Sequence, residues 1–257
     1  MVYAAMKRRD GYKKAFRLFR DGQRVHCGMR KVVLLLLSIG SSVFGITEAE
    51  LQVHIDTAIQ AGGGEVVIPP GEVLISKGLV VKDAKNLRII GYDAERSTLK
   101  LGAGAKVSLL ILEGSAAGVS IEKLVFDGGD AEAASGTSAL LQLAPIPTSK
   151  KEGQGIRVER CIFQNATGIG VHGSGISRCQ IQICTFKDLG SAAVRLDGAC
   201  QDVTVADCHM ARSAVAVELV HTEDCTVTGI ESRACGAGII VGKSASGTKL
   251  LRNAVEP

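Results

Sequence analysis

The sequence contains no tryptophan, three tyrosines, six phenylalanines and only five prolines among its 257 residues. Glycine, by contrast, occurs 31 times. Many glycines with few bulky side chains are typical of short strands joined by tight turns. Past residue 46 the aromatic residues are Tyr92, Phe126, Phe163 and Phe186, and we expect all four in the core. That leaves no exposed ring for a carbohydrate-binding module that stacks sugars on aromatic faces.

Positive charge is also scarce once the first 45 residues are set aside. Ten of the 30 lysines and arginines lie in that segment, together with two of the 26 acidic residues. The net charge of +4 therefore belongs to the N-terminal segment, because residues 46–257 hold 20 basic and 24 acidic residues. No basic surface that would attract nucleic acid is expected in this larger part of the chain.

A hydrophobic run long enough to cross a membrane comfortably is missing as well. The apolar residues from Val32 to Leu37, continuing through Ile39, follow Met29-Arg30-Lys31 and precede small residues up to Gly45. A short basic segment followed by a short apolar segment and then by small residues is typical of a signal peptide. We therefore predict a signal peptide at 29–45, and hence export to the periplasm, the cell surface or the medium. Residues 1–28 are then a non-native or extended leader. The alternative for the apolar run is a buried N-terminal helix.

An amphipathic helix is predicted from Thr47 to Ala61. Thr47 and Glu50 have the spacing of a capping box. One helical face is apolar, and three successive glycines follow the helix and end it. The apolar positions of that face are Leu51, Ile55, Ala58 and Ile59. Such a helix would cover the open end of a repeat protein.

The rest of the chain repeats with a period of about 22–25 residues. Four clear copies begin at Ile156, Cys179, Val203 and Cys225. Aligning them gives an apolar column (Val158, Ile181, Val205, Val227, Leu250), an aromatic column (Phe163, Phe186, Met210) and a cysteine column (Cys161, Cys184, Cys208, then Ile230). Each copy is followed by a second strand with period-2 alternation. These features predict an all-β, single-stranded parallel β-helix over 46–257, and they fit a leucine-rich repeat less well because the strands are rich in Val and Ile.

The second strands carry the residues that are best suited to chemistry. The alignment places outward His172 and Asp197 in one column, and Arg195 and Glu218 in the adjacent column, with His221 just beyond. Arginine can neutralise a uronate carboxylate while His172 or Asp197 moves the neighbouring proton. These four residues are the candidate catalytic set. The alternative is that they form exposed ion pairs of little energetic consequence.

The segments A-I-Q-A-G-G-G-E-V-V-I-P-P-G-E-V-L-I-S, N-L-R-I-I-G-Y-D and S-T-L-K-L resemble the opening of pectate-lyase-like β-helix proteins, and the later copies resemble the repeats of that superfamily. The resemblance covers Thr47 to the end and implies a right-handed helix. The superfamily includes polysaccharide lyases, hydrolases, epimerases, phage tailspikes and proteins without known catalysis, so the fold alone does not fix an activity.

The resemblance also implies particular residues and partners. His172 and Asp197 fit the active strand of mannuronan C5-epimerases, whereas Thr167 and Gly170 stand where a tyrosine and an aspartate would be. An acidic polysaccharide is the implied partner, and Ca²⁺ is implied by the superfamily alone. Asp127 and Asp130 are the nearest carboxylate pair, although two acids around Gly-Gly are also typical of a turn. Because no complete catalytic set is visible, a carbohydrate-related binding or structural role is favoured over a uronate lyase or C5-epimerase.

Seven cysteines lie past residue 46, an odd number that cannot pair completely within one chain. Their positions in the columns predict small buried side chains, with a Cys161–Cys184 disulfide as the alternative. The last strands before Pro257 are followed by no recognisable cap, so the terminal rung is expected to expose apolar side chains. Either the protein associates through this rung, or the sequence is a fragment of a longer β-helix.

Overall fold

The computed structural model describes residues 45–92, 97–129, 139–145 and 155–256. The predicted leader (1–28), nearly all of the predicted signal peptide (29–45) and Asp130 lie outside these ranges. Within them, no helix is long and apolar enough to span a membrane.

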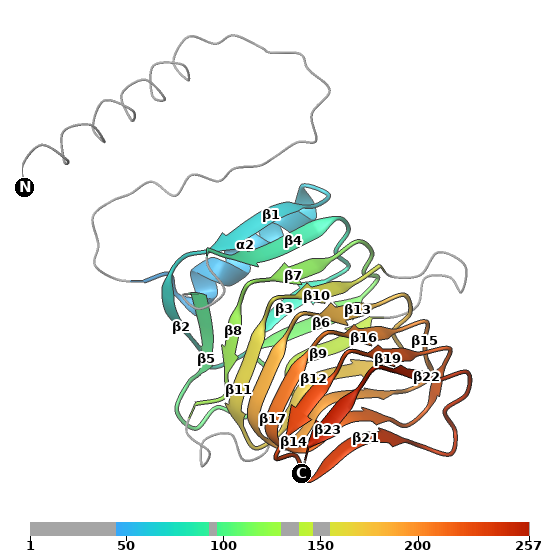
Figure 1. Ribbon diagram of the computed structural model, residues 1–257. Helices are drawn as coiled ribbons and strands as arrows, with labels where there is room; N and C mark the ends of the chain where they lie inside the picture. Colours follow the sequence, from blue (N-terminus) through green and yellow to red (C-terminus); the bar gives the residue numbers. More distant parts are fainter. Residues whose placement is uncertain (1–44, 93–96, 130–138, 146–154, 257) are drawn as a thin grey trace, which may run out of the picture. The chain divides into compact units, whose positions relative to one another are not determined.

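The described chain is a right-handed parallel β-solenoid, as the sequence predicts (Figure 1). One sheet forms the first side of every turn, and each of its strands pairs in parallel with the strand one turn away. Its members, in spatial order, are β1 (Gly64–Ile68), β4 (Leu87–Gly91), β7 (Ser120–Glu122), β10 (Arg157–Glu159), β13 (Gln180–Gln182), β16 (Thr204–Ala206), β19 (Thr226–Thr228) and β22 (Lys249–Leu251).

A second sheet closes the solenoid and has two limbs. The first limb contains β2 (Gly71–Ile75), β5 (Ser97–Leu101), β8 (Val125–Asp127), β11 (Ile162–Ala166), the first halves of β14 (Thr185–Asp197) and β17 (His209–Leu219), β20 (Glu231–Arg233) and β23 (Ala254–Glu256). The second limb contains β3 (Leu79–Lys82), β6 (Leu110–Gly114), β9 (Ala139–Pro145), β12 (Ile169–Ser174), the second halves of β14 and β17, and β21 (Ala237–Val241). β15 (Cys200–Gln201) and β18 (Thr222–Glu223) pair separately. A register shift between Leu189 and Ala192 separates the halves of β14, so the two limbs face different directions.

The predicted capping helix is confirmed. Helix α2 (Glu48–Gln60) has Thr47 as its N-cap with both hydrogen bonds of the capping box, and it buries Leu51, Ile55 and Ala58 against the first strands. Its polar side chains also bind the open strand end. The Glu48 carboxylate accepts hydrogen bonds from the backbone N–H groups of residues 76–78, and the Gln52 amide pairs with both backbone groups of Val80. The helix thereby satisfies groups that would otherwise be exposed at a sheet edge.

The predicted columns fill the interior. Val158, Ile181, Val205, Val227 and Leu250 are successive partners along the first sheet, and all but Leu250 in the last turn are buried. In the first limb a buried aromatic stack consists of Phe126, Phe163 and Phe186, followed by Met210. The neighbouring ring centroids lie 4.7 and 4.9 Å apart, and the stacked rings are nearly parallel.

The expectation that Tyr92 belongs to the buried aromatic column is wrong. Tyr92 follows the last residue of β4 and is 67% exposed, while Leu99 occupies the position opposite Phe126. The backbone N–H of Tyr92 donates to the hydroxyl of Ser97. One exposed ring is therefore present after all, one turn from the N-terminal end of the described solenoid.

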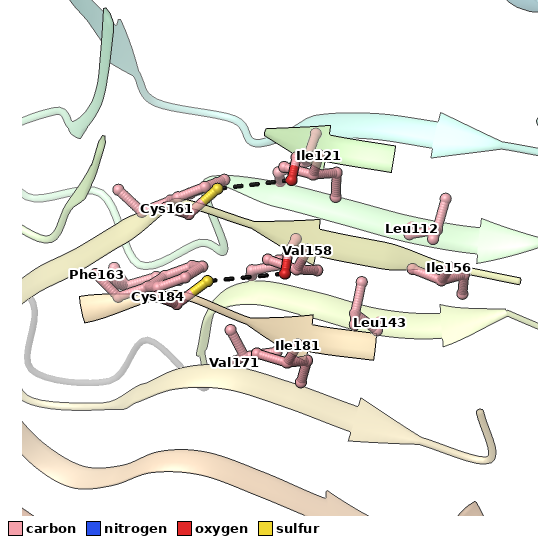
Figure 2. Close-up of a cluster of buried hydrophobic side chains, with 14 of the residues drawn as sticks. Leu112, Ile121, Leu143, Ile156, Val158, Cys161, Phe163, Val171, Ile181 and Cys184 are labelled. Carbon is pink, nitrogen blue, oxygen red and sulfur yellow. Dashed lines mark hydrogen bonds between the residues drawn. The ribbon is translucent and has the colours of Figure 1, made fainter. Parts of the chain in front are cut away.

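The seven cysteines of the described ranges are free thiols and form no Cys161–Cys184 disulfide; six of them are buried and Cys235 is half-buried. Cys161, Cys184 and Cys208 stack at the corner between the first sheet and the first limb, as expected. Each thiol also donates to a carbonyl oxygen of the preceding turn, and Figure 2 shows two such bonds, from Cys161 to Ile121 (3.6 Å) and from Cys184 to Val158 (3.7 Å). Burial raises the pKa of Cys200 to about 11 and that of Cys184 well above its usual value, so these thiols stay protonated and unreactive at neutral pH.

Candidate functional site

The four predicted catalytic residues meet on the outer face of the second limb, but in a different register from the one expected. His172 pairs with Arg195, and Arg195 pairs with Glu218, so these three residues form one column. Asp197 lies two residues further along its strand, opposite Ser174. The alignment of His172 with Asp197 was wrong by two residues, because Gly173 takes the buried position that Leu196 has on the next turn. A shift of two keeps every side chain on its own face, and the outward assignment therefore holds.

The side chains of the four residues form one connected network. The Nε2 atom of His172 lies 2.9 Å from Oδ2 of Asp197. The same carboxylate oxygen is 3.4 Å from Nε of Arg195, and NH1 of Arg195 is 3.6 Å from a carboxylate oxygen of Glu218. All four side chains are between 19% and 37% exposed, so a ligand on this face can reach the network. We refer to His172, Arg195, Asp197 and Glu218 as the charged cluster.

The environment of Asp197 stabilises its charged form. Partial burial raises the pKa of this carboxyl, but the hydrogen bond and charge of His172, a hydrogen bond from Ser174 and the charge of Arg195 outweigh burial. The pKa of Asp197 therefore lies below its ordinary value. Asp197 is an ionised hydrogen-bond acceptor at neutral pH and is poorly suited to donate a proton.

Two residues beside the cluster were missed by the sequence analysis. Gln142 in β9 is the partner of His172 in the preceding turn, and its side-chain oxygen lies 3.0 Å from Nδ1 of His172. An amide can present either an oxygen or an N–H group to the ring, so Gln142 orients His172 in either protonation state. Ser174 is the strand partner of Asp197 and hydrogen-bonds to its carboxylate, which orients that side chain. The signal in the sequence for Gln142 is its polar side chain between the apolar residues Leu141 and Leu143 of β9 (Ala139–Pro145).

The structure explains one departure from the epimerase pattern. A Cβ atom at Gly170 would lie 2.6 Å from the carbonyl oxygen of Ala193 and 2.8 Å from the ring of Phe186. Gly170 is thus required by the packing of the aromatic stack, and a catalytic aspartate does not fit at this position.

The carboxylate pair considered for Ca²⁺ is only half described. Asp127 accepts a hydrogen bond from the backbone N–H of Gly129 and others from the amides of Gln164 and Asn165. These hydrogen bonds are typical of an aspartate that stabilises a turn. Among the described residues, no group of three or more His, Cys, Asp or Glu side chains is arranged to hold a metal ion.

Comparisons with known proteins agree with this fold. Residues 146–256 match the family model described as a right handed beta helix region. No curated protein matches the chain. Among solved structures, the A-module of a mannuronan C-5 epimerase from Azotobacter vinelandii is similar, with 19% identity and a TM-score of 0.50 over 80% of this chain and 72% of that one.

Two further structures show how varied the proteins of this fold are. The catalytic unit of an α-1,3-glucanase from Streptomyces thermodiastaticus is 14% identical, with a TM-score of 0.54 over 82% of this chain and 48% of that one. A tailspike of Acinetobacter baumannii bacteriophage Fri1, a capsular polysaccharide depolymerase, is 13% identical, with a TM-score of 0.51 over 76% of this chain and 46% of that one. At these identities the likeness concerns the fold alone. The chain has the right-handed parallel β-helix fold.

Proposed function

We propose that the protein is an exported β-helix that binds a polysaccharide on the outer face of its second limb, with the charged cluster as the centre of the binding site. The observation that carries this proposal is the network itself, in which His172, Asp197, Arg195 and Glu218 contact one another in sequence. The side chains hold each other in place before any ligand arrives, which reduces the entropy lost on binding. The similar solved structures include proteins named for their action on polysaccharides, which supports this ligand class.

Binding is favoured over catalysis because the charged groups of the cluster form ion pairs with one another. Arg195 is shared by two carboxylates, and the pKa of Asp197 is held low by His172 and Arg195 despite its partial burial. A general acid or base needs a pKa closer to the working pH. Asp197 is therefore not poised to donate a proton in this arrangement.

A uronate lyase or C5-epimerase is the second candidate. It is favoured by one specific observation, the pairing of His172 and Asp197 at 2.9 Å beside a guanidinium group. In such an enzyme His172 would exchange the proton next to the carboxyl group and Arg195 would neutralise that group. Incubation of the purified protein with a uronate polymer tests this candidate. Unsaturated products would show lyase activity, and sugars inverted at C5 within the polymer would show epimerase activity.

Replacing Asp197 with asparagine is expected to weaken polysaccharide binding by about tenfold, because it removes a charged acceptor from the centre of the site. Affinity electrophoresis through gels that contain different polysaccharides measures the effect as lost retardation. His209→Ala is the matched control, since His209 lies 3.0 Å from Glu231 on the first limb, outside the charged cluster. Equal retardation of Asp197→Asn and the wild type on every polymer would place the ligand elsewhere.

Export is part of the same proposal and rests on the apolar segment between Lys31 and Gly45. Expression of the full chain in a bacterial host should yield protein outside the cytoplasm whose first residue follows Gly45, as read by mass spectrometry. Uncleaved chain confined to the cytoplasm would contradict it.

The terminal strands support self-association as a further part of the proposal. Leu250, Leu251 and Val255 are each about half exposed, and β22 and β23 each pair with one neighbour among the described strands. Unpaired parallel edges with apolar side chains favour association. Light scattering should show an oligomer that Leu250→Lys dissociates, and an unchanged mass for that variant would exclude this surface.

A further inference from the structure

On four adjacent strands of the second limb, β9, β12, β14 and β17, the outer face carries one fixed positive charge. The described outward residues of β9, β12, β14 and β17 on this limb are Gln142, Ala144, His172, Ser174, Arg195, Asp197 and Glu218. Arg195 is the only lysine or arginine in this set, and two of the others are carboxylates. With a neutral imidazole the charged cluster therefore has a net charge of −1, and with a protonated imidazole its charge is zero.

Arg195 is already paired electrostatically with two carboxylates. Its Nε atom is shielded from solvent, lies 3.4 Å from Oδ2 of Asp197 and makes no hydrogen bond, and its NH1 atom lies 3.6 Å from a carboxylate oxygen of Glu218. A uronate carboxylate could reach the guanidinium only by competing with two carboxylates that are already in place. The incoming charge would also approach Asp197 and Glu218, and like charges a few ångströms apart repel each other in a partly desolvated site.

The same groups suit uncharged sugar hydroxyls well. Asp197 and Glu218 accept hydrogen bonds, and the amide of Gln142 both accepts and donates. Charge-assisted bonds from hydroxyl groups to carboxylates are short and about twice as strong as neutral ones. The column continues on either side into apolar residues, Ile111 before Gln142 and Ile240 after Glu218. Ile240 is 40% exposed and can cover the C–H face of a sugar ring.

We infer that the ligand of the charged cluster is a neutral polysaccharide, and not a uronate polymer. This inference rests on the proposed function, because it specifies the ligand of the same site. It reverses the expectation of an acidic polysaccharide that the superfamily resemblance implies.

Polymers that differ only in their carboxyl groups provide the test. Polygalacturonate, alginate and glucuronan are each compared with their carboxyl-reduced derivatives, which keep the linkages but lack the charge. Affinity electrophoresis of the full chain at low salt should show retention on at least one reduced polymer that is about tenfold stronger than on its acidic parent, the order expected for one like-charge repulsion in a partly solvated site. Stronger or equal retention on the acidic parent would overturn the inference while leaving the proposed function intact.

A double variant tests the stated cause. Asp197→Asn with Glu218→Gln removes both negative charges and releases Arg195, so this protein should lose retention on the reduced polymer and gain it on the acidic parent. The matched control is His209→Ala with Glu231→Gln, which removes a histidine–carboxylate pair from the first limb and should behave as the wild type. No gain on any acidic polymer would refute the charge argument. Failure of the wild type to bind either member of every pair would overturn the proposed function, and the inference with it.

Discussion

Truncating Phe163 to alanine is expected to lower the free energy of unfolding by about 3–5 kcal/mol, the usual range for removal of a fully buried aromatic side chain. Phe163 is the middle ring of the stack, with Phe126 on one side and Phe186 on the other. All three rings are inaccessible to solvent. Removal of the middle ring leaves a cavity that the regular backbone spacing of a parallel sheet cannot close. Guanidinium denaturation followed by circular dichroism measures the change.

Phe163→Leu is the matched control for this prediction, because leucine fills much of the same volume and already occupies the equivalent position at Leu99. It should cost clearly less than the alanine variant. A loss below about 1 kcal/mol for Phe163→Ala would mean that the stack does not hold the rungs together, since such a small value is typical of a partly exposed site.

The second large effect is expected at the N-terminal cap. Glu48→Ala should destabilise the protein by about 2 kcal/mol, because hydrogen bonds to charged groups contribute about 1.5–3 kcal/mol. Its carboxylate accepts from the backbone N–H groups of Ser76, Lys77 and Gly78 at 2.9 to 3.1 Å. Loss of these bonds frees the strand end that the helix covers. Thermal unfolding and hydrogen exchange of these three amides measure the effect.

Glu48→Gln keeps an acceptor oxygen and should recover part of the lost stability. Asp56 gives an exposed control on the same helix, since its described hydrogen bond is to Gln52 within the helix. If Asp56→Ala and Glu48→Ala were equally destabilising, the bonds to residues 76–78 would have no special role in closing the solenoid.

Most of the fold could be predicted from the sequence because each turn of a parallel solenoid needs residues of the same kind at the same positions. The buried columns through Val158 and Phe163, and the capping box at Thr47, are confirmed at the level of individual residues. A parallel β-helix places equivalent residues directly above one another, so a repeat in the sequence becomes a contact in space.

The candidate site was predictable only in part. Period-2 alternation identifies the outward face but tolerates a shift of two residues, and the register of His172 was wrong for that reason. Gln142 was missed because β9 precedes the clear copies of the repeat. The exposure of Tyr92 depends on where β4 ends, which local sequence determines poorly.

Histidine NMR on the folded protein tests the central claim most directly. With the imidazole carbons labelled, addition of a polysaccharide that retards the protein in gels should shift the resonance of His172, which lies inside the charged cluster, and leave that of His209 unchanged. His172→Gln assigns the signal and should abolish the response. A polysaccharide that binds the protein while the His172 resonance stays unshifted would contradict the assignment of the second limb as the binding face.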